Sequence, residues 1–163
     1  MIRTLLTLCV LLLLGACAGH APLPDSPPNL ALPLQLHVQR EQAGQTQDWL
    51  LVVQQEGPAL RWSLMDPMGI PIARQLLTGN QWQNDGLLPP NAEARELFAA
   101  LLFALTPAEQ LPAHYPRADW QQNAQQRRLN QDGSARWQVT YEQPLIFRLS
   151  TPPGLSYRVE TLP

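Results

Sequence analysis

Lysine is missing from this sequence: all 11 basic residues are arginines, and 13 acidic residues bring the formal net charge to −2. Charged residues make up 15% of the chain, whereas about 25% is usual in globular proteins. A nucleic-acid-binding protein normally carries a basic surface that neutralises phosphates, and no such footprint is present. We therefore expect no nucleic-acid partner. The 45% content of hydrophobic residues is enough for one packed core.

The residue patterns of common catalytic and metal sites are also missing. The three histidines, His20, His37 and His114, are far apart and show no metal-ligand spacing such as H-x₃-H. No G-x-S-x-G nucleophile motif occurs. We therefore expect no catalytic residue, no metal site, no cofactor and no enzymatic activity. His37 falls on the polar side of an alternating segment, which favours a solvated histidine over a functional one.

No apolar run is long enough to cross a membrane as a helix. The longest, Leu5–Leu14, would span about 15 Å, half of a bilayer's hydrocarbon core. With Arg3 before it, the run is typical of a signal-peptide h-region. Leu14-Gly15-Ala16-Cys17 then resembles the bacterial lipobox, in which the cysteine is lipidated and the peptide is cut just before it. The alternatives are an ordinary secretory signal with a chance cysteine, or a buried helix, which the lack of an amphipathic period disfavours.

The chain has only two cysteines, and this prediction removes both from disulfide chemistry. Cys9 would leave with the signal peptide (residues 1–16), and the thiol of Cys17 would carry lipid, although the periplasm permits disulfides. Ala18 and Gly19 follow the cysteine. By resemblance to known sorting signals, the lack of Asp there favours the outer membrane. We expect a monomer anchored to the outer membrane through Cys17 and facing the periplasm.

Proline is abundant, with 17 residues in the chain, and five of them fall between residues 18 and 33. This composition favours extended polyproline-type backbone, so residues 17–33 are interpreted as the lipidated cysteine and a semi-rigid tether. The folded domain is then residues 34–163. The tether would hold that domain off the membrane.

The rest of the chain has the pattern of strands around one helix. Apolar residues alternate with polar ones from Leu34 to Val38 and from Leu60 to Leu64, as in half-buried strands. From Ala94 to Leu105 they recur with helical spacing, and Asn91 can cap that helix. Strand patterns return after residue 120. The expected fold is mainly β with a central helix: an incomplete antiparallel β-barrel, or highly curved sheet, wrapped over an amphipathic helix.

The segment Leu60-Arg61-Trp62-Ser63-Leu64-Met65-Asp66-Pro67-Met68-Gly69 resembles LolB, an outer-membrane lipoprotein receptor related in fold to LolA. Both have a strand, an Asx-Pro-apolar-Gly turn, a second strand and a helical stretch. The chain is still more similar to a family of small bacterial lipoproteins, domain of unknown function 3261. Members of that family are often encoded beside aryl-polyene or fatty-acid-like biosynthesis genes. The resemblance covers about residues 34–162 and implies a half-barrel with a helical plug and an apolar cavity for acyl chains.

Two sets of candidate functional residues follow from the resemblance. The apolar residue of the LolB turn projects into solvent and helps to insert lipoproteins into the membrane. Pro67 and Met68 match that turn, although Met68 could instead be tucked against its own hairpin. The second set contains residues that could line the acyl-chain cavity, although an ordinary packed core is the alternative: Trp49, Trp62, Trp82, Leu97, Phe98, Leu101, Trp137 and Tyr141.

Two classes of function remain open at this point. The first is a lipoprotein that binds acyl chains or a lipidated partner in its barrel, in lipid or lipoprotein trafficking or envelope biogenesis. Such a protein could serve an aryl-polyene-type pathway. The second is a non-catalytic structural or interaction lipoprotein of an envelope assembly.

Overall fold

The computed structural model of the protein describes residues 21–162. The predicted signal peptide and Cys17 lie outside this range. Within it, no helix is both long and apolar enough to span a bilayer.

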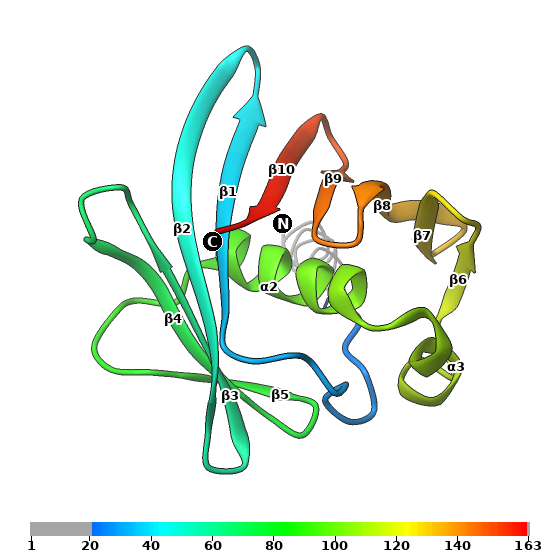
Figure 1. Ribbon diagram of the computed structural model, residues 1–163, viewed down its shortest axis with the longest axis horizontal. Helices are drawn as coiled ribbons and strands as arrows, with labels where there is room; N and C mark the ends of the chain where they lie inside the picture. The colour runs from blue at the N-terminus through cyan, green and yellow to red at the C-terminus, as the bar shows by residue number, and fades with distance from the viewer. Residues whose placement is uncertain (1–20, 163) are drawn as a thin grey trace, which may run out of the picture.

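The described residues form one antiparallel sheet of ten strands in the order β5-β4-β3-β2-β1-β10-β9-β8-β7-β6. The sheet stays open, because edge strands β5 and β6 each have one neighbour. It curves around helix α2 (Figure 1). A mainly β fold with a central helix is thus confirmed. The strands are β1 (Leu34–Gln42), β2 (Gln45–Glu56), β3 (Ala59–Met65), β4 (Pro71–Thr78), β5 (Gln81–Asn84), β6 (Asp119–Gln122), β7 (Gln126–Gln131), β8 (Ser134–Gln143), β9 (Ile146–Thr151) and β10 (Leu155–Thr161).

The centre of the sheet joins the two ends of the described chain. β1 pairs with β10 so that Val38 lies opposite Val159, and both are fully buried. The alternation predicted for β1 is present: Leu34, Leu36 and Val38 point to the core and the intervening residues point outward. Since β1 and β10 are far apart in sequence, this pairing unites the N-terminal and C-terminal halves of the sheet in one layer.

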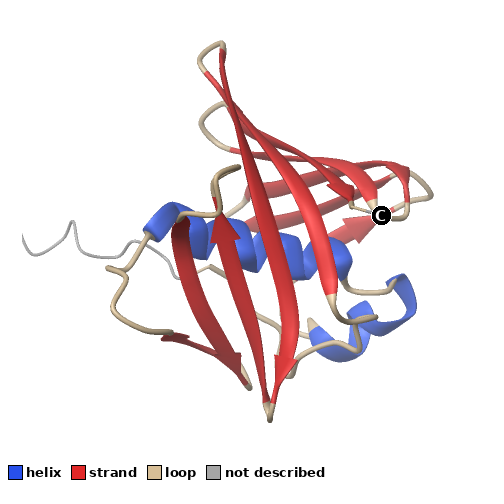
Figure 2. Ribbon diagram, turned by 60° about the vertical axis from the view of Figure 1, so that its left-hand side comes forward, coloured by secondary structure: helices blue, strands red, loops and turns tan. Residues whose placement is uncertain are grey.

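Helix α2 (Ala92–Leu105) is buried on every side rather than along one stripe. Every residue from Leu97 to Ala104 is buried. Figure 2 shows strands on both sides of the helix. The predicted cap is confirmed, since the Asn91 side chain accepts a hydrogen bond from the backbone N–H of Ala94 at 3.0 Å. The sequence prediction placed apolar residues on one face only, and the small residues Ala99 and Ala100 let other segments approach the opposite face.

Part of that opposite face is covered by residues 21–33, which we call the N-terminal strap. Pro24 and Pro28 are buried in it, and Leu23 and Leu30 pack against the core. Residues 21–33 of the predicted tether are therefore docked on the folded domain and do not form a stalk that stands away from it. Proline-rich composition indicates an extended backbone, but it does not exclude packing of that backbone against a core.

The strap is held by polar contacts with the segment after α2, which contains the 3-10 helix η1 (Ala108–Gln110) and helix α3 (Leu111–His114). The backbone N–H of Asp25 donates to the His114 carbonyl at 2.8 Å, and that of Asn29 donates to Gln110 Oε1 at 3.0 Å. Arg117 also forms an ion pair with Asp25 at 2.7 Å. In Figure 1 the strap passes beside α2 and α3.

Two carboxylates bind the first turns of α2 to the sheet. Glu93 accepts from Arg40 Nε at 2.5 Å and from the Tyr157 hydroxyl at 3.0 Å. Glu96 accepts from Arg136 Nε at 2.8 Å. Acidic groups near a helix N-terminus also favour the helix dipole. The contacts therefore stabilise the helix and set its position against β1, β8 and β10.

Arg127 on β7 binds the other end of α2. Its Nη1 group donates to the carbonyls of Phe103, Ala104 and Thr106 at 2.7, 3.2 and 2.8 Å. These carbonyls lie at the helix C-terminus, where a cation is favourable. Burial lowers the pKa of the Arg127 guanidinium, but an arginine stays charged in proteins. The two ends of α2 are thus each bound to the sheet by arginine.

The packing of α2 predicts a large effect of truncating Phe98. This side chain is fully buried and contacts Trp62 with the ring centroids 5.4 Å apart. Phe98→Ala should lower the free energy of unfolding by about 3–5 kcal/mol, because it removes buried surface and leaves a cavity. Leu87→Ala is the matched control, since Leu87 is fully exposed. The free energies of unfolding of both variants, measured by chemical denaturation, test this prediction. A loss under about 1 kcal/mol for Phe98→Ala would show that α2 does not hold the core together.

A histidine bridges two carboxylates on the outer face of the sheet. His37 Nδ1 lies 3.0 Å from Glu160 Oε1, and Nε2 lies 2.8 Å from Asp48 Oδ1, which joins β10, β1 and β2. The pKa of His37 is raised. The hydrogen bond to Glu160 is the largest cause, burial opposes it as the next largest, and the hydrogen bond to Asp48 raises the pKa further. The same contact with His37 lowers the pKa of Asp48.

This bridge predicts a pH dependence of stability. Because the folded pKa of His37 is raised, its contribution is complete below the ordinary histidine value of about 6.5 and is lost as the pH rises through the raised value. The unfolding free energy of the wild type should therefore fall between pH 6 and 9 more steeply than that of His37→Gln. His114→Gln serves as the control variant. Equal slopes in denaturation series for wild type and His37→Gln would contradict the prediction.

Candidate functional site

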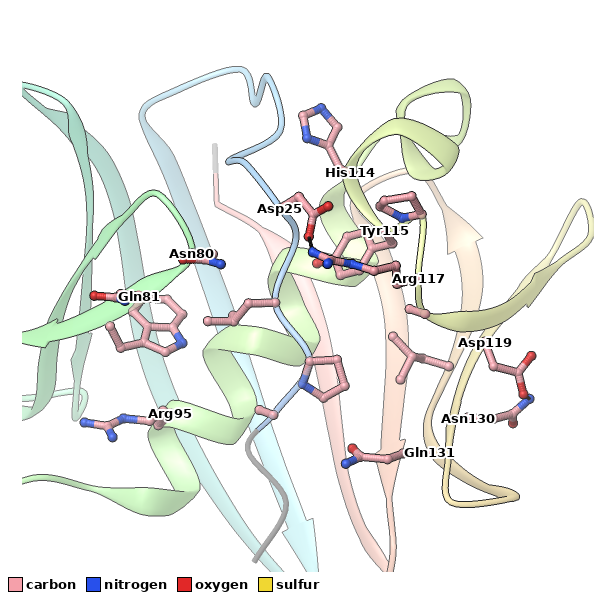
Figure 3. A pocket seen from close by; sticks show the side chains of 17 residues that line it. Asp25, Asn80, Gln81, Arg95, His114, Tyr115, Arg117, Asp119, Asn130 and Gln131 are labelled. Atoms are coloured by element: carbon pink, nitrogen blue, oxygen red, sulfur yellow. Dashed lines mark hydrogen bonds and ion pairs between the residues drawn. The ribbon is translucent and has the colours of Figure 1, made fainter.

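A groove of about 870 Å³ lies on the open side of the sheet, between its two edges (Figure 3). The strap, the β4–β5 turn and β5, the start of α2, the segment from α3 to β6, and β7 all contribute to its walls. The residues that line it are Ala21, Pro22, Leu23, Asp25, Asn80, Gln81, Trp82, Arg95, His114, Tyr115, Pro116, Arg117, Ala118, Asp119, Leu129, Asn130 and Gln131. Its volume is in the range of small-molecule sites, about 300–1,000 Å³.

The acidic groups of the groove already have partners. Asp25 pairs with Arg117 at 2.7 Å, and Asp119 accepts from the Asn130 side chain at 3.0 Å. Figure 3 shows these two pairs toward the top and the right of the groove and Arg95 on α2 at the left. The groove therefore combines an apolar surface with polar groups at its rim. That composition suits an amphiphilic ligand better than a wholly polar one.

Most of the predicted cavity-lining residues lie instead in the packed core. Trp62, Leu97, Phe98, Leu101 and Trp137 are all fully buried. They contact other core side chains, for example Phe103 with Trp137 at a centroid distance of 5.9 Å. Their prediction as cavity walls is corrected for a physical reason: the side chains of α2 fill the space inside the curved sheet.

The other three predicted residues lie nearer the surface. Trp82 lines the groove, with its ring centroid 5.9 Å from that of Phe98. Tyr141 lines a separate depression near the C-terminal end of α2 and donates its hydroxyl proton to the Ala104 carbonyl at 2.7 Å. Trp49 packs beside Tyr157, with centroids 6.2 Å apart. Of the eight predicted residues, five thus lie in the core and Trp82 lies in the groove. Tyr141 and Trp49 lie outside both.

Sequence reasoning missed most of the groove residues. Leu23 was assigned to the tether, and Tyr115 and Ala118 fall in a segment without a clear period. Leu129 and Asn130 lie in a segment predicted as a strand, and Trp82 was among the predicted cavity-lining residues. The one available signal was the apolar content of the strap, since Leu23, Leu30 and Leu32 are unusual for a solvated linker.

The β3–β4 turn carries the predicted apolar tip. The Asp66 carboxylate accepts from the backbone N–H groups of Met68 and Ile70 at 2.9 and 2.8 Å, and Gly69 has a φ of +82°, which favours glycine. Met68 is 86% exposed and Ile70 57% exposed. Pro67 is exposed as well. Of the two alternatives for Met68, the structure has the exposed one.

A third exposed apolar residue lies in the loop that leads to α2. Leu87 is fully exposed, and nearby Asp85 donates its backbone N–H to the Arg74 carbonyl of β4 at 3.3 Å. This loop and the β3–β4 tip project on the same side in Figure 1. The charged side chain in this loop is paired: Asp85 forms ion pairs with Arg61 and Arg74 at 2.9 and 3.0 Å.

The titratable residues of residues 21–162 do not assemble a metal site. In this part of the chain, no three His, Cys, Asp or Glu side chains are grouped so that they could hold a metal ion.

The fold and groove define a class of protein: a single antiparallel sheet wrapped around a buried helix, with a groove at its open side. A family model described as "Protein of unknown function (DUF3261)" matches residues 33–153. The chain belongs to this family, as the sequence predicted. A search of curated proteins finds no match to the chain.

Proposed function

We propose that this protein is a LolB-like outer-membrane lipoprotein that faces the periplasm and binds an acyl chain or a lipidated partner. The groove is the observation that carries the proposal. It offers about 870 Å³ beside a fully packed core, and partly exposed side chains such as Leu23, Trp82 and Ala118 line it. We place the acyl chain in this groove, and not inside the barrel as the resemblance implies.

The position of the strap supports a site close to a membrane. Ala21 lines the groove, four residues after the predicted acyl anchor at Cys17. Four residues span at most about 14 Å when fully extended. An anchor at Cys17 therefore keeps the groove close to the bilayer surface, where acyl ligands are found.

The exposed tip formed by Pro67, Met68 and Ile70 supports a second contact with lipid. Exposed apolar side chains on a hairpin tip have no partner in the described protein, and methionine adapts readily to an irregular apolar surface. Asp66 binds backbone groups of its own turn, so the tip presents no unpaired carboxylate beside Met68.

A structural or interaction lipoprotein is the second candidate function. The observation that favours it is the interior: α2 is buried on all sides, so the core has no space for a ligand around Leu97 to Ala104. In this case a protein partner, and not an acyl chain, would occupy the groove.

Filling the groove tests the binding proposal. Full-length protein extracted from membranes should carry a non-covalent acyl adduct in native mass spectrometry, beyond the lipid bound to Cys17. Ala118→Trp should reduce that adduct at least about tenfold, because the indole occupies groove volume. Ala113→Trp on the exposed face of α3 is the matched control. A stoichiometric protein partner without any lipid would instead favour the second candidate.

Spin labelling tests the lipid contact of the tip. A label attached at Met68→Cys of the full-length protein in nanodiscs should be protected from a water-soluble relaxation agent and accessible to oxygen, as expected for immersion in lipid. Thr140→Cys is the control, because Thr140 is exposed within β8, away from the β3–β4 tip, and does not line the groove. If both labels are equally accessible to the water-soluble agent, the tip does not contact the membrane.

A further inference from the structure

One arginine of the groove has no counter-charge. Arg95 forms no hydrogen bond or ion pair with any residue in the described range, whereas each of the other described arginines has at least one such partner. Asn91 and Ala99, one helical turn away on either side, carry no charge. The nearby acids Glu93 and Glu96 bind Arg40 and Arg136 instead.

The position of Arg95 in α2 is unfavourable without a ligand. It lies in the first turns of the helix, where the helix dipole places partial positive charge and a further cation is destabilising. Its Nε atom is buried and has no hydrogen-bond partner. A buried donor of this kind normally binds an acceptor.

A second unpaired donor lines the same groove. The Nε1 atom of Trp82 is likewise buried without a partner. The Trp82 ring packs against Phe98, which lies three residues after Arg95 on α2 and therefore on the neighbouring surface of the helix. The groove thus offers two N–H donors, one of them charged, and both lack an acceptor.

The remaining walls are suited to a hydrocarbon chain. Pro22, Leu23 and Ala118 contribute apolar surface, and the buried side chain of Leu129 packs behind it. The acids at the rim do not compete for Arg95, because Asp25 is paired with Arg117 and Asp119 with Asn130. In Figure 3 both pairs lie apart from Arg95.

We propose that the groove binds a single-chain amphiphile with an anionic head, a carboxylate or a phosphate, and that Arg95 and the indole N–H of Trp82 bind the head. This inference rests on the proposed acyl-chain function and names the chemistry of its ligand. A guanidinium donates two N–H groups side by side, which matches carboxylate and phosphate oxygens. A neutral head of the same size would leave the charge of Arg95 uncompensated.

Photo-crosslinking of the full-length protein in nanodiscs tests the head group. The probes share one diazirine-labelled C16 chain and differ only in their head: a fatty acid, a lysophosphatidic acid and a fatty alcohol. Labelled peptides are identified by mass spectrometry, so groove peptides are distinguished from those that contact bulk lipid. The acid or the phosphate should label groove peptides about tenfold more than the alcohol. Which of the two does so identifies the carboxylate or the phosphate as the natural head.

Variants test whether the preference for anionic probes depends on Arg95 and Trp82. Arg95→Gln should remove the preference for the anionic probes, Arg95→Lys should retain part of it, and Trp82→Phe should reduce it severalfold while keeping an aromatic ring. Arg128→Gln is the matched control, because Arg128 is exposed on β7 and does not line the groove. Thermal unfolding of each variant shows that it is folded.

The outcomes separate the two proposals. Equal labelling of groove peptides by all three probes, unchanged in Arg95→Gln, overturns the anionic head and leaves acyl-chain binding intact. If no probe labels groove peptides, the acyl-chain function itself is wrong. A preference for the anionic probes that Arg128→Gln abolishes as strongly as Arg95→Gln would show general surface attraction and would also overturn the assignment.

Discussion

The packing of helix α2 inside the curved sheet is the interaction on which the rest of the structure depends. An open antiparallel sheet of ten strands has one apolar face that must be removed from water, and its curvature leaves room for one helix along that face. Residues Leu97 to Ala104 fill this room completely. Aromatic side chains of the strands pack against the helix, as Trp62 and Trp82 do against Phe98 and Trp137 does against Phe103.

When a helix is buried on all sides, the charged side chains and the unpaired backbone groups at its two ends need partners. Glu93 and Glu96 bind strand arginines at the N-terminal end, and Arg127 binds three carbonyls at the C-terminal end. These contacts are directional, so they set the position of α2 along the sheet, which apolar packing alone leaves less well defined. Arg95 is the exception among the charges of the helix, and its lack of a partner distinguishes the groove from the rest of the surface.

The groove exists because the cover over α2 is incomplete. The strap and the segment around α3 cover the part of the helix that faces the gap between β5 and β6, and the space that they leave is the groove. The site is therefore built from segments that are distant in sequence: residues near 22, 82, 95, 117 and 130. Its walls include the strap, which follows closely after the predicted acyl anchor. A membrane anchor and a ligand site would thus be neighbours in this protein.

The sequence by itself determined the local features: alternation in β1 and β3, the Asp66–Gly69 turn and the capped helix after Asn91. Each depends on residues within a few positions of one another, and their physical causes are local. Only the tertiary structure decided where the helix lies, which tryptophans are core, and that the strap is docked. Trp62 and Trp82 have similar strand patterns, but one packs against α2 at the centre of its strand and the other lies at the sheet edge. That difference follows from strand order and curvature, which no local pattern encodes.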